Sequence, residues 1–151
     1  MYLDEWDDRQ DRLAILSIGA CRLGLPLSEV AYFAQISQRQ AIQDGPPWMS
    51  GVVADRDNPG AFLPVVNLSL LWHDAALGGH ATNLVVTRSG LALEVDSYSA
   101  TREPLYLTPL RPAPGNHALR YASLLEGQPL PIVDTAQLIT TAQWQSLAAT
   151  A

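Results

Sequence analysis

The sequence contains no lysine, and its nine basic residues are all arginines. Without lysine the chain can form neither a Walker-type phosphate loop nor a lysine Schiff base. Charged residues make up only 16% of the chain, against an average of about 25%. The arginines form no basic stripe, which nucleic-acid binding through phosphate contacts would require. The composition therefore excludes lysine-dependent phosphate and carbonyl chemistry and argues against a nucleic-acid-binding protein.

Cysteine and long hydrophobic runs are also scarce. The single Cys21 cannot form an intramolecular disulfide, which indicates a reducing compartment. No segment approaches the roughly 20 apolar residues that span a bilayer, and no signal-peptide pattern opens the chain. We therefore expect a cytoplasmic protein. The hydrophobic fraction of 48% is ample for the core of one domain or two very small ones.

Acidic residues are concentrated at the start of the chain. Five of the 15 acids precede the first apolar run: Asp4, Glu5, Asp7, Asp8 and Asp11. A segment this polar has little apolar surface to bury, so residues 1–11 are predicted to form a solvated, flexible leader. The alternative is an acidic tail that steers a basic partner toward the protein.

Eleven prolines and ten glycines divide the remaining apolar residues into short runs. Closely spaced runs with turn signals between them predict a mostly β protein built from small barrels. Pro64, inside one of these runs, is expected at a sheet edge or bulge. In the last segment, residues 135–149, apolar residues recur at helical spacing and predict a terminal helix. Strands are predicted at 13–18, 23–27, 30–34, 51–56, 62–68, 84–88, 91–95, 105–110 and 129–133.

No catalytic motif is evident. His73, His80 and His117 lack the spacing of known zinc motifs, and there is no Gly-x-Ser-x-Gly nucleophile elbow. Glu94 and Asp96 alternate along a predicted strand and so share one face. Two such carboxylates are compatible with acid–base chemistry, but a solvated strand face explains them equally well. We expect no catalytic, cofactor-binding or metal-binding residues and no enzymatic activity.

Three segments, in order and at matching separations, resemble the CheW family of bacterial chemosensory adaptors. The first is 46–53 (PPWMSGVV), which runs on through Arg56 to 63–68 (LPVVNL). The second is 84–86 (LVV) through 95–96 (VD), and the third is 110–114 (LRPAP), followed by 129–134 (PLPIVD) and 138–139 (LI). The LRPAP run is similar to the family's Ile-Arg-Pro-Ala-Pro run almost letter for letter. The resemblance extends over about residues 12–140, which is nearly the whole chain.

The resemblance implies two five-stranded SH3-like barrels that share one core, followed by a C-terminal helix. The first barrel would span about residues 20–82, and the second about 83–134 together with the strand at 13–18. The implied function is a non-catalytic adaptor that couples a CheA-type histidine kinase to a chemoreceptor or another sensor, in chemotaxis or pilus-type motility. The alternative is a small β-barrel regulatory module that binds a small molecule or another enzyme.

Carried over position by position, the resemblance implies a set of partner-binding residues. Arg56 would be the family's hairpin arginine, and Val30 and Val86 would line a groove between the barrels that receives the receptor. Tyr32 and Phe33 stand beside that groove, where the family typically has a Glu-Ile pair. For Arg56 two interpretations stay open: an exposed partner anchor, or a guanidinium that tacks the hairpin to the body through backbone carbonyls.

Several positions depart from the family pattern. Asn67 stands where the family usually has Asp, and the hairpin after Arg56 carries about two extra residues at 58–60. The second hairpin, around residues 89–90, is shortened. Because these departures gather on the part of the pattern that faces the receptor, they indicate a divergent member that serves a specialised pathway.

Overall fold

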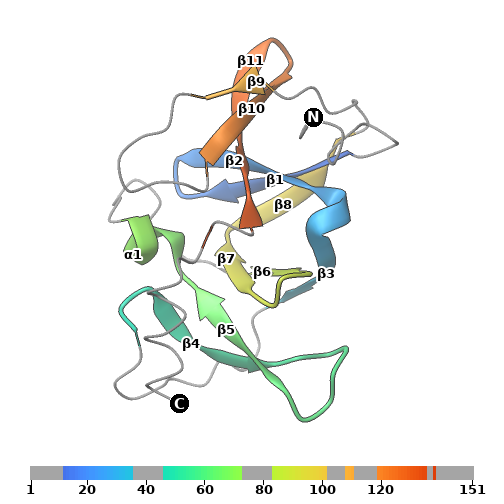
Figure 1. Ribbon diagram of the computed structural model, residues 1–151, viewed down its shortest axis with the longest axis vertical. Helices are drawn as coiled ribbons and strands as arrows, with labels where there is room; N and C mark the ends of the chain where they lie inside the picture. The colour runs from blue at the N-terminus through green and yellow to red at the C-terminus, as the bar shows by residue number, and fades with distance from the viewer. Residues whose placement is uncertain are drawn as a thin grey trace.

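The computed structural model describes residues 12–35, 46–72, 83–101, 108–110, 119–135 and 138, and these form two β-sheets. The six-stranded sheet, in the upper half of Figure 1, has the order β8 (Ser97–Ala100), β1 (Leu13–Ile18), β2 (Cys21–Pro26), β11 (Gln128–Val133), β10 (Leu119–Leu125) and β9 (Thr108–Pro109). The five-stranded sheet below it has the order β3 (Val30–Gln35), β6 (Asn83–Thr87), β7 (Ala92–Val95), β5 (Phe62–Val66) and β4 (Met49–Ala54). A 3-10 turn, η2 (Leu27–Glu29), and one turn of helix, α1 (Leu68–Trp72), complete the described elements.

The mostly β expectation is confirmed. Within the described residues neither strand order returns to its first strand, so both sheets are open and the closed barrels stay a prediction. The terminal helix predicted over 135–149 lies outside the described residues, apart from Thr135 and Leu138. The leader at 1–11 and the first half of the strand predicted at 105–110 also lie outside them.

The strands divide between the sheets differently from the expected barrel ranges. Strand β2, expected in the first barrel, pairs with β1 from Leu13↔Pro26 to Ile18↔Cys21. Gly19 has φ 58 and supplies the two-residue turn between them, so β2 folds back directly beside β1. Strands β6 and β7, expected in the second barrel, pair instead with β3 and β5.

Two described strands have no counterpart among those predicted, β8 and β10. All four residues of β8 are exposed, and the strand is held at the sheet edge by its pairing with β1. An edge strand of this kind has no buried face, so its sequence lacks the alternation by which strands are recognised. Its formation depends on the neighbouring strand.

The five-stranded sheet is buried on both faces. One face joins the core between the two sheets, here called the central core, to which β7 contributes Leu93 and Val95. The other face carries a separate group, here called the inner cluster: Tyr32, Val53, Leu63, Val65, Leu84, Val86 and Ala92. Double burial explains why residues 91–95 form an almost continuous apolar run. A third cluster covers the six-stranded sheet: Leu13, Tyr121, Leu125, Leu130 and Ile132.

Pro64 lies in β5, an interior strand of the five-stranded sheet. Its pairing with β7 begins only at Val65↔Ala92, while on the other side Pro64 faces Val52 of β4. Since proline lacks a backbone donor, it fits where one side of the ladder has not yet started. The expectation of an edge or bulge is therefore wrong, because β5 lies between β7 and β4, and Pro64 is accommodated where the ladder with β7 has not yet begun.

Candidate functional site

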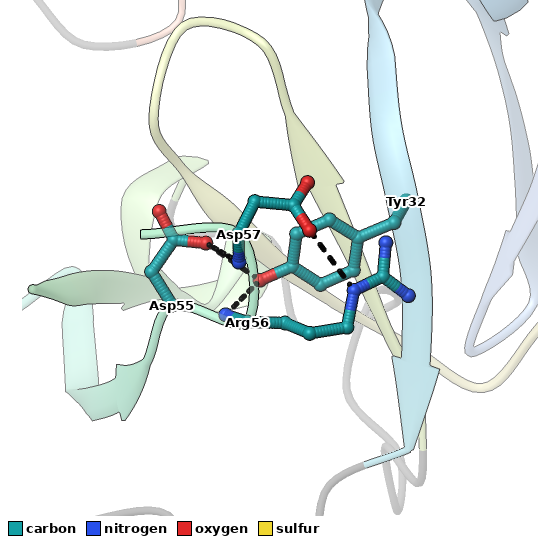
Figure 2. Close-up of polar contacts among 4 residues, drawn as sticks. All are labelled: Tyr32, Asp55, Arg56 and Asp57. Carbon is teal, nitrogen blue, oxygen red and sulfur yellow. Dashed lines mark hydrogen bonds and ion pairs between the residues drawn. The ribbon is translucent and has the colours of Figure 1, made fainter. Parts of the chain in front are cut away.

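A tyrosine joins the two outermost strands of the five-stranded sheet. Strands β3 and β4 stand at opposite ends of the strand order. The hydroxyl of Tyr32, on β3, donates to Asp55 Oδ1 at 3.0 Å, just after β4 (Figure 2). The same hydroxyl accepts a hydrogen bond from the backbone N–H of Arg56, also at 3.0 Å. The sheet is therefore curled enough to bring its two edges within reach of one side chain.

Arg56 lies across the face of the Tyr32 ring, as Figure 2 shows. Its guanidinium carbon is 3.9 Å from the ring centroid, within the range of a cation–π contact. Its Nε donates to Asp57 Oδ1 at 3.1 Å, and the Asp57 backbone N–H donates to Asp55 Oδ1 at 3.0 Å. The Arg56 side chain is 62% exposed. No backbone carbonyl among the described residues accepts a hydrogen bond from the Arg56 guanidinium. The interpretation in which this guanidinium fastens the hairpin through backbone carbonyls therefore does not apply to the described residues.

A small hollow opens beside this cluster, between the edges of β3 and β4. Its volume is about 220 Å³, and its floor is formed by apolar side chains of the inner cluster. Three of the sequence-predicted residues, Tyr32, Arg56 and Val86, meet here. The lining residues are Tyr32, Ala34, Gln35, Val53, Ala54, Arg56, Leu84 and Val86.

Val30 and Phe33 lie on the other face of the sheet. Val30 packs in the central core, and Phe33 packs against that core while stacking on Tyr98 of β8, with ring centroids 4.2 Å apart. A bulge between Val30 and Tyr32 reverses the usual rule that residues two apart on a strand share a face. The expectation that Val30 and Val86 line one groove is therefore wrong in its geometry.

The interpretation of Glu94 as part of a solvated strand face is also wrong. Glu94 is only 6% exposed, and its carboxylate accepts hydrogen bonds from Ser50 Oγ and from Asn67 Nδ2, the latter at 3.2 Å. Asp96 bonds elsewhere, accepting from the Gly19 N–H at 2.7 Å. The two carboxylates thus form no shared acid–base site.

This buried network accounts for the amide at position 67. Asn67 donates to the buried carboxylate of Glu94, whereas an Asp at this half-buried position would place a second negative charge against it. The departure from the family's Asp is therefore matched to Glu94. Sequence reasoning missed the pairing because the partners lie on β4, β7 and the residue after β5.

Sequence reasoning also missed the roles of Asp55 and Asp57. Their signal is the run Asp55-Arg56-Asp57 at the end of the strand predicted at 51–56, because aspartates in turns commonly accept hydrogen bonds from nearby backbone N–H groups. Burial raises the pKa of the Tyr32 hydroxyl above its usual value near 10, the hydrogen bond to Asp55 adds to the shift, and the Arg56 N–H opposes it. At neutral pH this hydroxyl is therefore protonated and able to donate.

In the described part of the chain no group of three or more His, Cys, Asp and Glu side chains could hold a metal ion. His73, His80 and His117 lie outside that part. Among the described residues no helix is both long and apolar enough to cross a membrane.

No family model and no curated protein matches this chain. The fold nevertheless has a solved counterpart in a scaffolding protein. It is similar to the scaffolding protein TtCheW from Thermoanaerobacter tengcongensis, with a TM-score of 0.73 and 15% sequence identity. The match covers 88% of this chain and 90% of that chain. At this identity the likeness establishes a CheW-like fold.

Proposed function

We propose that this protein is a non-catalytic adaptor of bacterial signal transduction, acting in the cytoplasm. In this role it couples a CheA-type histidine kinase to a chemoreceptor or another sensor, in chemotaxis or pilus-type motility. The CheW-like fold supports the class of function, together with the CheW-like segments of the sequence. The observation that carries the proposal is the display of Arg56, held flat on Tyr32 and 62% exposed beside an apolar hollow.

This arrangement suits contact with another protein. Within the described residues the terminal nitrogens of Arg56 have no hydrogen-bond acceptor, so they are available to a partner's carboxylate or carbonyl oxygens. Ordering a long side chain at an interface costs about 0.5–1.5 kcal/mol. Because the Arg56 side chain is already stacked on Tyr32, part of this ordering cost does not fall on the binding step. We propose Arg56 as the exposed contact residue of one surface, supported from beneath by the buried Tyr32 and Val86, with Phe33 beside Tyr98 as a second surface and Val30 as its buried support.

The test compares two arginines with the same change of charge. Arg56→Glu is expected to weaken binding of the cognate CheA-type kinase, measured by calorimetry, by about 2 kcal/mol, roughly thirtyfold. Its melting temperature should remain within about 2 °C of wild type, since the side chain is exposed. The control is Arg22→Glu, at an exposed position of β2 in the other sheet. Equal loss of binding in both variants, or none in either, would contradict the assignment of Arg56.

The second candidate is a regulatory module that would bind a small molecule in this hollow. Its volume of about 220 Å³ is below the roughly 300–1,000 Å³ of most ligand pockets. That size accommodates one or two side chains better than a whole ligand, which is why we prefer the adaptor. A rise in melting temperature with a metabolite library, abolished by Ala34→Leu at the lining, would reverse this preference.

A further inference from the structure

We infer that Tyr32 is the positioning residue of this surface: it fastens the two edges of the five-stranded sheet and thereby sets the orientation of Arg56. The fastening is intramolecular and stands without any partner. Only the final consequence, an effect on partner binding, rests on the proposed function.

The two edge strands of the five-stranded sheet, β3 and β4, are not paired with each other in the described strand order. The described strand order runs from β3 to β4 without closing, so no ladder of backbone hydrogen bonds ties these two strands together. The polar link between them is the Tyr32 hydroxyl, which reaches Asp55 Oδ1 and the Arg56 N–H at 3.0 Å each. One hydroxyl thus holds the loop after β4 against β3.

The hydrogen bonds among Tyr32 and the run Asp55-Arg56-Asp57 form a closed circuit. Asp55 Oδ1 accepts from both the Tyr32 hydroxyl and the Asp57 N–H, and Asp57 Oδ1 accepts from Arg56 Nε. The Arg56 N–H returns to Tyr32, while the Tyr32 ring carries the guanidinium 3.9 Å from its centroid. Arg56 is therefore held at its backbone and at its side chain by the same tyrosine (Figure 2).

A phenol side chain is chemically suited to position 32. The hydroxyl donates to a carboxylate and accepts from an amide at once, which neither phenylalanine nor a carboxylate can do. Burial of Tyr32, at 8% exposed, keeps competing water away from these bonds. An ionised phenolate would meet the negative charges of Asp55 and Asp57, so the neutral form is the one that fastens the loop.

The deciding variant is Tyr32→Phe, which keeps the ring under Arg56 and removes only the hydroxyl. Tyr98→Phe is the matched control, because no hydrogen bond from the Tyr98 hydroxyl is described and its ring stacks on Phe33. The readout is the exchange rate of the Arg56 backbone amide and Nε–H protons, measured by nitrogen-edited NMR. Tyr32→Phe should raise both rates at least tenfold, with amides of β1 and β2 unchanged.

A second variant removes the acceptor instead of the donor. Asp55→Ala, at a half-buried position just after β4, should accelerate Arg56 exchange in the same way without touching the sheet interior. It also serves if Tyr32→Phe fails to fold. Wild-type exchange at Arg56 in either folded variant would overturn the inference. Uniform acceleration across the sheet would overturn it too, because Tyr32 would then be a general packing residue.

Partner binding supplies the last readout. Tyr32→Phe should weaken kinase binding about fivefold, and in an Arg56→Glu background the same change should weaken it no further. The two proposals fail separately. If Arg56→Glu binds normally while Tyr32→Phe still accelerates exchange at Arg56, the proposed function fails and the positioning role stands. If Arg56→Glu abolishes binding while Tyr32→Phe changes neither exchange nor affinity, the positioning role fails alone.

Discussion

Replacing Glu94 by alanine removes a buried carboxylate from the network with Ser50 and Asn67. A hydrogen bond to a charged group contributes about 1.5–3 kcal/mol, so the loss of two such bonds amounts to about 4 kcal/mol of unfolding free energy. In a chain of this length it corresponds to a fall in melting temperature of about 10 °C.

Glu94→Gln removes the negative charge of the side chain but keeps its size and shape. Ser50 and Asn67 bond to different oxygens of Glu94, and a glutamine keeps an oxygen at only one of these two positions, so one of the two bonds loses its acceptor. We expect a loss of about 2 kcal/mol, midway between wild type and alanine. The loss should shrink in the presence of Asn67→Asp, since a neutral amide at 94 can donate to the new carboxylate.

Urea unfolding followed by circular dichroism measures these differences. Glu126→Gln is the matched control, the same chemical change at an exposed turn residue, and it should alter the unfolding free energy by less than about 0.5 kcal/mol. A loss below about 1 kcal/mol for Glu94→Ala would refute the reasoning, because it would mean that the folded protein does not bury a paired carboxylate there.

Three further outcomes are expected. Gly24→Ala places its Cβ about 2.6 Å from Cδ1 of buried Ile132 and should cost about 1–3 kcal/mol in urea unfolding, recovered largely by adding Ile132→Val. Glu126→Asn should raise stability by up to about 1 kcal/mol, since Glu126 and Gly127 form a two-residue hairpin turn with φ 53 and 79. Because the pKa of Tyr32 is raised in the folded protein, its neutral side chain stabilises the fold below about pH 10. The melting temperature should therefore fall as the pH rises through the folded pKa, and it should fall less in Tyr32→Phe.

Local patterns predicted most of the strands because their causes are local. Apolar alternation and turn residues located β1, β3 and the hairpin of β6 and β7, where Gly90 has φ 93 in the turn. The same patterns could not assign strands to sheets. Strand β2 went to the six-stranded sheet because its turn with β1 is tight, and β8 formed only because β1 offered an edge.

The candidate site was predictable in part. Arg56 could be located from the sequence, because an arginine at the end of the strand predicted at 51–56 and before a strong turn signal lies close to a hairpin turn. Its contact with Tyr32, 24 positions earlier in the chain, depends on the sheet curling so that its two edges meet. Neither the sequence around Tyr32 nor the sequence around Arg56 indicates that the two residues are in contact.

The sequence by itself determined that this chain is rich in short strands, poor in charge and free of lysine chemistry, since composition and two-residue periodicity belong to the chain. Only the tertiary structure decided which face each residue takes. A single bulge sends Val30 to the central core and Tyr32 to the inner cluster. Likewise Glu94, one residue from Val95, is buried with polar partners because the sheet is covered on both faces, and a period of two cannot say which face meets water.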